Sequence, residues 1–110
     1  MHSELEQALS SPEQAYRYAL NVLQGRFPEG EPVIAQDSRW AYYYARDVID
    51  VINDRWPEGE AVIAKDAEYA YMYARWVIKS RFPEGEAAIR KVPYWRTNYR
   101  ENVLDIRYDI

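Results

Sequence analysis

Apolar residues in this chain recur with the spacing of one helix face, in three nearly identical segments. In the third segment, which starts at Asp66, the apolar positions fall on one side of a helix that turns 100° per residue. They are Ala70, Tyr71, Tyr73, Ala74, Val77 and Ile78. Together they cover an arc of about 160°, which is wider than a single packing seam. We therefore expect each long helix to have neighbours on two sides.

The same pattern predicts one long and one short helix in each segment. The long helices are expected over residues 12–25, 38–54 and 67–80, and the short helices over residues 28–36, 57–65 and 83–91. Each long helix should end near an aromatic-proline pair, because the residue before a proline is pushed out of helical geometry. Ser11, Asp37 and Asp66 stand at the expected starts, where a side-chain oxygen can accept a hydrogen bond from an unpaired backbone amide.

These segments are copies of one sequence unit. Ala-Tyr-x-Tyr-Ala motifs begin at Ala15, Ala41 and Ala70, and Arg-Phe/Trp-Pro-Glu-Gly-Glu motifs begin at Arg26, Arg55 and Arg81. The period is 26 residues once three extra residues, 50–52, are removed from the second copy. We expect this insertion, close to one helical turn, to lengthen the second long helix. A fixed period of this size is typical of stacked helical units that cannot bury their apolar faces alone.

A fourth, degenerate copy begins at residue 92. Tyr99, Val103 and Leu104 keep the apolar positions, whereas Arg96 and Arg100 replace the two alanines. Charged residues there suit a terminal unit whose outer face stays in contact with water. We therefore predict an all-α, solenoid-like array of alternating short and long helices, with about 3.5 repeats in one domain. The domain spans residues 1–110, with repeats at 11–36, 37–65 and 66–91, a capping repeat at 92–104 and a tail at 105–110.

The repeat resembles a known tandem pattern. Pro-Glu-x-Ala-Tyr-x-Tyr-Ala, then Val-Ile, then Arg-Phe/Trp-Pro-Glu-Gly-Glu is similar to a repeat in uncharacterised bacteriophage and bacterial proteins, and it covers residues 11–104. Gln14 departs from the pattern, since Trp40 and Tyr69 stand at that place in the next two copies. The resemblance implies a phage origin, but it brings no established activity and no catalytic residue.

Composition narrows the class of protein. Hydrophobic residues make up 48% of the 110 residues, which excludes a disordered chain, and no apolar run reaches the ~18 residues of a membrane span. Without a secretory signal pattern or any cysteine, the chain is expected in the cytoplasm, which is the host cytoplasm if a phage encodes it. The 18 acidic and 14 basic residues leave no basic patch, which argues against nucleic acid as a partner.

Groups suited to catalysis or metal binding are few. The chain has no cysteine and its single histidine is His2, so a nucleophile would lack a well-placed base. The paired glutamates of each Pro-Glu-Gly-Glu motif suit a helix start, where acids complement the helix dipole, better than a metal site. The arginine that opens each motif is expected to pair with these glutamates. We therefore predict no catalytic residue, no metal, no cofactor and no enzymatic activity.

Eleven tyrosines and four tryptophans are the compositional anomaly. Tyrosines on the alanine side, such as Tyr44 and Tyr73, are assigned to packing, with hydroxyls that reach polar atoms at the rim. A second set lies on the opposite side of the long helices, and we call it the aromatic stripe. Its candidate partner-binding residues are Trp40, Tyr43, Arg46, Tyr69, Met72, Arg75, Trp76 and Trp95. Two interpretations stay open: the short helices cover the stripe, or it is an exposed surface of the residue types that make interface hot spots.

These observations predict a non-enzymatic protein-binding module with a host or phage protein as its partner. The most concrete form of this prediction is a phage-encoded inhibitor that occludes a host defence protein. The alternative is a structural or self-assembling protein, a homo-oligomer joined through the aromatic stripe. An enzyme or small-ligand binder that uses tyrosines in a groove is a third class.

Overall fold

A computed structural model describes residues 4–49 and 55–104 of the chain. All regular structure in these residues is helical, which confirms the predicted all-α class. The long helices are α2 (Pro12–Tyr18) continued by η1 (Ala19–Leu23), α4 (Ser38–Tyr44) continued by η3 (Ala45–Ile49), α6 (Ala67–Met72) continued by η5 (Tyr73–Ile78), and α8 (Pro93–Asn102). The short helices are α1 (Glu4–Ala8), η2 (Pro28–Gly30) with α3 (Glu31–Ile34), α5 (Pro57–Ile63), and η6 (Pro83–Gly85) with α7 (Glu86–Arg90).

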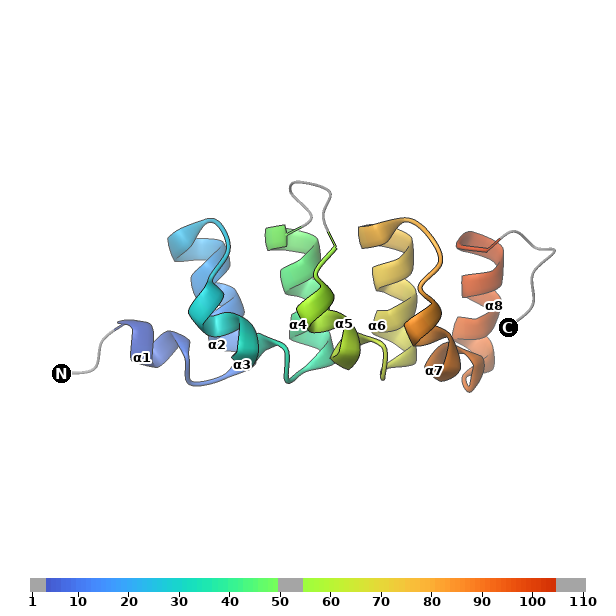
Figure 1. Cartoon of the computed structure of the whole chain (residues 1–110), viewed down its shortest axis with the longest axis horizontal. Helices are drawn as coiled ribbons and strands as arrows, with labels where there is room; N and C mark the ends of the chain where they lie inside the picture. Colours follow the sequence, from blue (N-terminus) through green and yellow to red (C-terminus); the bar gives the residue numbers. More distant parts are fainter. Residues whose placement is uncertain (1–3, 50–54, 105–110) are drawn as a thin grey trace.

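The helices stand in a row that follows the order of the sequence (Figure 1). The long helices α2, α4, α6 and α8 lie side by side, each in contact with the next, and the short helices run along one face of the row. Each later short helix also contacts the long helix before it, so that α3 packs on α2, α5 on α4 and α7 on α6, whereas α1 contacts the long helix after it, α2. The molecule is therefore elongated, with principal-axis extents of 57 × 25 × 18 Å.

The helix starts agree with the predicted caps. The side chains of Ser11, Asp37 and Asp66 each accept a hydrogen bond from the backbone N–H three residues on, at 3.2, 3.1 and 3.1 Å. These bonds satisfy donors that the first turn of a helix leaves unpaired. The local sequence therefore determines where each of these long helices begins.

The second half of each of these helices is wound more widely than an α-helix. In η1, η3 and η5 the backbone adopts π geometry, in which hydrogen bonds span five residues instead of four. Gln24 and Lys79 then take left-handed conformations, with φ of 53° and 54°, and their amides bond to the carbonyls of Ala19 and Ala74. A left-handed residue stops a helix, so the first and third long helices end two residues before the predicted ends. The predicted extension by residues 50–52 lies outside the described residues.

Small residues face each other where the turns meet the long helices. A Cβ built on Gly30 would lie 3.2 Å from the Cβ of Ala15, and one built on Gly85 would lie 2.8 Å from the Cβ of Ala70. The alanines of all three Ala-Tyr-x-Tyr-Ala motifs are completely buried. The backbone of the turn therefore approaches the helix closely, which only small side chains permit. The aromatic residue of each turn is also buried; these residues are Phe27, Trp56 and Phe82.

The fourth unit keeps the apolar positions of the repeat. Tyr99 and Leu104 are buried and Val103 is half-buried. Arg96 and Arg100, which replace the buried alanines of the other units, are half-buried and keep part of their surface in contact with water. The predicted tail at residues 105–110 lies outside the described residues.

Candidate functional site

A hydrogen-bonded cluster joins each later long helix to the turn of the unit before it. At the middle junction the hydroxyl of Tyr73 donates to Oε2 of Glu60 at 2.6 Å and accepts from the backbone N–H of Trp56 at 2.9 Å. Arg55 adds two parallel hydrogen bonds to the Glu60 carboxylate, at 2.9 and 3.0 Å. The hydroxyl thereby pairs a buried amide that would otherwise lack an acceptor. We call this cluster the tyrosine clasp.

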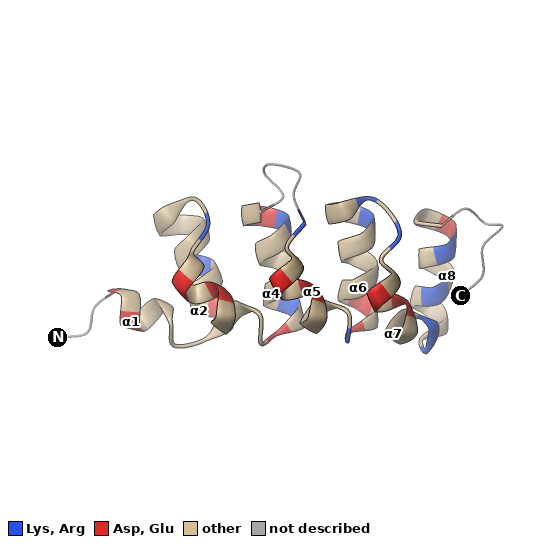
Figure 2. Cartoon of the chain, in the orientation of Figure 1, with Lys and Arg blue, Asp and Glu red and all other residues tan. Residues whose placement is uncertain are grey.

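The tyrosine clasp recurs at the other two junctions. Its members are Tyr44, Glu31, Phe27 and Arg26 at the first junction and Tyr99, Glu86, Phe82 and Arg81 at the third. The hydroxyl–carboxylate distances are 2.6 and 2.7 Å, and both amide–hydroxyl distances are 2.8 Å. Figure 2 shows the result along the row: basic residues lie in the loops that follow the first three long helices, and acidic residues lie at the start of the short helix after each loop. The predicted pairing of each turn arginine with a glutamate is confirmed.

The clasp shifts the ionisation of its members in opposite directions. Burial alone would raise the pKa of Glu60 and Glu31, but hydrogen bonds from the arginine and the tyrosine hydroxyl outweigh it and hold the pKa below its usual value. For Glu86 the hydrogen bond from its arginine is the main cause of the lowered pKa. Burial, and then the hydrogen bond to the carboxylate, raises the pKa of each clasp tyrosine well above 10.0. At neutral pH the clasp therefore consists of a neutral tyrosine and an ionised glutamate.

The hydroxyls of Tyr44 and Tyr73 reach polar atoms, as predicted, but these atoms lie inside the junction and not at the rim of the packing. Tyr44, Tyr73 and Tyr99 are completely buried, and their hydroxyls bond inside the junction. A signal was available: in every clasp the tyrosine follows the glutamate by 13 residues and the aromatic residue of the turn by 17. Comparing side chains across units at fixed spacing would have paired them.

The aromatic stripe packs on the rings of neighbouring long helices. Trp40 lies 5.5 Å from Tyr16 between ring centroids, and Trp95 lies 5.4 Å from Tyr71. Tyr43 contacts Trp40 edge to face, at 5.4 Å and 78°. The half-buried members of the stripe are Trp40, Tyr43, Tyr69, Met72, Arg75 and Trp95. Tyr43 also contacts Tyr69 of the next unit edge to face, at 6.2 Å and 86°. The structure therefore brings Trp40, Tyr43 and Tyr69 of two adjacent units together.

One aromatic side chain of the stripe, that of Trp76, is exposed to solvent. The side chain of Trp76 is 49% exposed. The stripe residues lie roughly opposite the buried alanines on each long helix, and it is the alanine side that faces the turns and short helices. The interpretation in which the short helices cover the stripe therefore does not describe Trp76, and the stripe is a half-open face.

Both arginines of the stripe lie over aromatic rings. The guanidinium of Arg46 is 5.0 Å from the centroid of Tyr43, and that of Arg75 is 4.6 Å from the centroid of Trp76. Arg46 also donates two hydrogen bonds to Asp47, at 2.6 and 2.8 Å. Burial would raise the pKa of Asp47, but hydrogen bonds from Arg46 and a tyrosine hydroxyl outweigh it and lower the pKa. These contacts hold both cations in place on the face.

The described residues contain neither a cluster that could bind a metal ion nor a helix that could span a membrane. Within residues 4–49 and 55–104, no three histidine, cysteine, aspartate or glutamate side chains converge where a metal ion could bind. In that same part of the chain, no helix combines the length and the apolar character needed to cross a bilayer. Comparison of the chain with protein-family models, curated proteins and solved structures finds no match. The resemblance to phage and bacterial repeats stays a prediction.

Proposed function

We propose that the chain is a non-enzymatic protein-binding module and that the aromatic stripe is its binding face. The observation that carries the proposal is the exposure of Trp76 on a face otherwise made of half-buried rings. Tryptophan, tyrosine and arginine are the residue types that most often dominate the binding energy of protein interfaces. An exposed tryptophan beside Arg75, with further rings around it, suits the centre of such an interface.

The stripe is ordered before a partner arrives. Trp40 is packed on two tyrosine rings, and Arg46 is held by two hydrogen bonds to Asp47. Side chains that are already fixed lose less conformational entropy on binding, so more of the contact energy remains as affinity. The long axes of 57 and 25 Å also leave room for the roughly 800 Å² that each partner buries in a typical complex.

The most specific form of the proposal is a phage-encoded inhibitor that acts in the host cytoplasm. It rests on the resemblance of the repeat to bacteriophage and bacterial sequences. The partner is a host protein, such as a component of a defence system, whose working surface the stripe covers. Because such an inhibitor occludes its target and does not modify it, inhibition should be stoichiometric: one equivalent of the chain should be required per target.

The test compares variants for binding to a partner that is captured from host lysate and then purified. Trp76→Ala should weaken affinity at least tenfold, which corresponds to about 1.4 kcal/mol, because the exposed anchor is lost. Val92→Ala, which truncates an exposed apolar side chain outside the stripe, is the matched control and should bind like the wild type. Both variants should keep their unfolding temperature within a few degrees. Wild-type affinity in Trp76→Ala would contradict the assignment of this face.

Self-association is the second candidate function. It is favoured by exposed apolar side chains of the N-terminal segment and first unit, which are Leu5, Leu20, Val22 and Leu23. Light scattering over a range of concentrations separates the two functions. A molar mass that stays that of the monomer would exclude the homo-oligomer, whereas a mass that rises with concentration would support it.

A further inference from the structure

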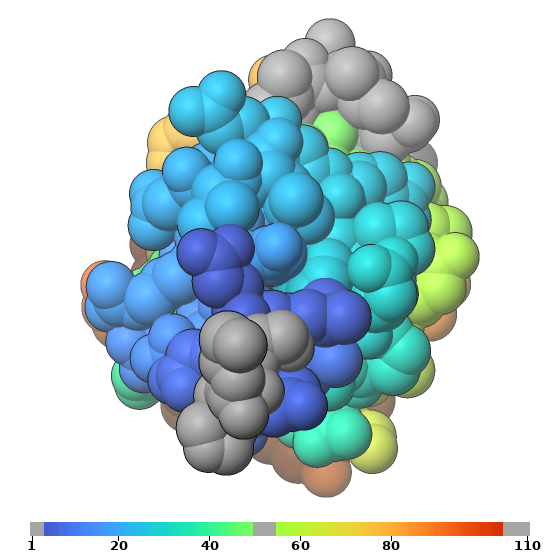
Figure 3. All heavy atoms as spheres, turned by 90° about the vertical axis from the view of Figure 1, so that its left-hand side faces the viewer, coloured from blue at the N-terminus to red at the C-terminus, as the bar shows by residue number. Residues whose placement is uncertain are grey.

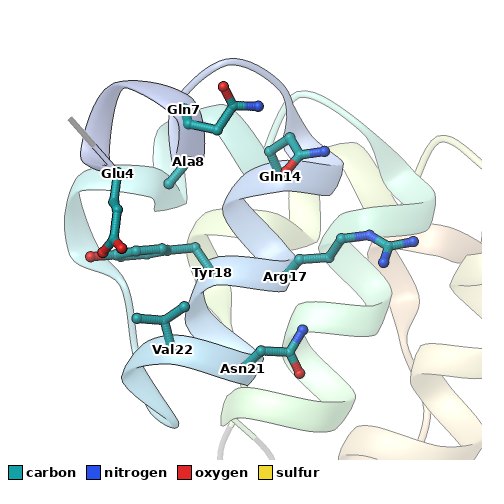
Figure 4. A pocket seen from close by; sticks show the side chains of 8 residues that line it. All are labelled: Glu4, Gln7, Ala8, Gln14, Arg17, Tyr18, Asn21 and Val22. Carbon is teal, nitrogen blue, oxygen red and sulfur yellow. The ribbon is translucent and has the colours of Figure 1, made fainter. Parts of the chain in front are cut away.

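The position of Trp76 in the repeat carries a polar residue in the other three units. These residues are Asn21, Asp47 and Asn102. Figure 3 looks onto the first unit, and Figure 4 shows Gln14, Arg17 and Asn21, which occupy its stripe positions, one above another along the long helix beside a pocket. An aromatic side chain at this position is therefore a property of the third unit alone.

In two other units the polar residue at this position bonds to the unit before it. The hydroxyl of Tyr16 donates to Oδ2 of Asp47 at 2.5 Å, and Nδ2 of Asn102 donates to the hydroxyl of Tyr71 at 3.1 Å. The indole of Trp76 makes no hydrogen bond within residues 4–49 and 55–104, and the side chain is 49% exposed. The third unit therefore lacks a contact that joins the row elsewhere, and it exposes an indole instead.

In the second unit the arginine before this position is paired with a carboxylate, since Arg46 donates two hydrogen bonds to Asp47, at 2.6 and 2.8 Å. Arg75 is the equivalent arginine of the third unit. It lies 4.6 Å from the centroid of the Trp76 ring and donates to the hydroxyl of Tyr71 at 3.2 Å. It forms no ion pair within the described residues. The cation is thus held on the face, and an indole occupies the place of its carboxylate.

The charges around the stripe favour an acidic group on the partner. Arg39 donates to the hydroxyl of Tyr69 at 3.2 Å and, like Arg75, forms no ion pair within the part of the chain that the structure describes. The carboxylate of Asp47 is already occupied by Arg46 and Tyr16. An interface that covers Arg75 must therefore supply a carboxylate, because a charge that is buried without a partner is strongly destabilising.

We propose that Arg75 and Trp76 together bind an acidic residue of the partner protein, a glutamate or an aspartate that stands next to an apolar residue. The carboxylate takes the place on Arg75 that Asp47 takes on Arg46, and the apolar side chain covers the exposed indole. A guanidinium that is already ordered on a ring can donate two parallel hydrogen bonds to a carboxylate. This assignment rests on the proposed function of the stripe and adds the chemistry that the partner presents to it.

The probe is the peptide acetyl-Ala-Leu-Glu-Phe-Ala-amide, with acetyl-Ala-Leu-Gln-Phe-Ala-amide as its neutral counterpart. Titrated into the 15N-labelled full chain, the glutamate peptide should shift the indole N–H resonance of Trp76. It should bind about fivefold more tightly than the glutamine peptide, because only a carboxylate forms charge-assisted hydrogen bonds with Arg75. This preference should disappear in Arg75→Gln. Lys91→Gln, which removes an exposed cation outside the stripe, is the matched control and should keep the preference.

Several outcomes would overturn the proposal. They are a titration to about 5 mM glutamate peptide that leaves the Trp76 resonance unshifted, equal affinity of the two peptides for the wild type, and a preference that survives in Arg75→Gln. A short oligothymidylate that binds Arg75 and Trp76 more tightly than the peptide would make a phosphate the ligand. A molar mass that rises with concentration in the wild type but not in Arg75→Gln would place the carboxylate on a second copy of the chain.

The partner purified from host lysate separates failure of this assignment from failure of the proposed function. Wild-type affinity in Trp76→Ala would reject the stripe as the binding face. Weakened binding in Trp76→Ala together with wild-type affinity in Arg75→Gln would reject only the acidic residue, and the proposed function would stand. Weakened binding in both variants is the expected result.

Discussion

The turn glycines leave no room for a side chain. A Cβ built on Gly59 would lie 2.2 Å from a ring carbon of Trp56. Gly59→Ala should therefore destabilise the protein by about 1–3 kcal/mol in urea unfolding, because the ring and the turn must move apart. Gly25→Ala is the matched control, since its Cβ would meet nothing closer than 4.0 Å, and it should be neutral or slightly stabilising. Equal losses in the two variants would contradict the packing described for the turn.

The left-handed residue after the third long helix predicts a gain in stability. Lys79 has φ 54°, a conformation that costs a residue with a side chain about 1–2 kcal/mol and costs glycine almost nothing. Lys79→Gly should stabilise the protein by about 0.5 kcal/mol, after the greater freedom of glycine in the unfolded chain is subtracted. Lys91→Gly, at a right-handed helix end with φ −76°, should instead destabilise. A loss of stability in Lys79→Gly would show that the left-handed turn carries no strain.

At the scale of one clasp, two titrating groups make stability depend on pH on both sides of neutrality. The pKa of each clasp glutamate is lower in the folded protein, so the stability it contributes is complete above its unfolded value of about 4.5 and is lost as the pH falls below it. The pKa of each clasp tyrosine is raised, so its contribution is complete below the unfolded value of 10.0 and is lost as the pH rises above it. The free energy of unfolding should therefore fall below pH 4.5 and above pH 10.

Glu60→Gln isolates the acidic side of this profile. The variant should be less stable than the wild type at pH 7, and the difference should shrink as the pH is lowered toward 3, because the wild-type carboxylate becomes protonated. Urea unfolding at a series of pH values measures both curves. Parallel curves between pH 7 and pH 3 would mean that the clasp carboxylate does not control acid stability.

Features of the helices and turns that depend on residues close together in the sequence could be predicted from it. Ser11, Asp37 and Asp66 cap helices through partners three residues away, and each turn arginine meets a glutamate five residues on. The helix ends were not predictable, because the π winding and the left-handed residues depend on how a long helix fits against its turn. The clasp hydrogen bonds were also missed, since they join residues of different units and need the stacking geometry.

For the whole molecule, the period of the helix was enough to place the stripe residues on one side, but not to identify their neighbours. Trp40 meets Tyr16, and Tyr71 meets Trp95, only because one unit stacks on the next with the observed offset. In a row of this kind, stability is approximately the sum of the units and of the interfaces between neighbours. The same side chain should therefore contribute differently inside the row and at its end.

Removing one hydroxyl at two equivalent positions tests this account most directly. Tyr73→Phe leaves the buried N–H of Trp56 without an acceptor and Glu60 without a donor, and it should lower the free energy of unfolding by about 1–3 kcal/mol. Tyr18→Phe removes the same atom at the equivalent position of the first unit, where the hydroxyl makes no hydrogen bond with residues 4–49 or 55–104, and it should change stability by less than about 0.5 kcal/mol. Urea unfolding of the two variants beside the wild type gives both values. Similar losses at the two positions, or no loss in Tyr73→Phe, would contradict a row of units joined by tyrosine clasps.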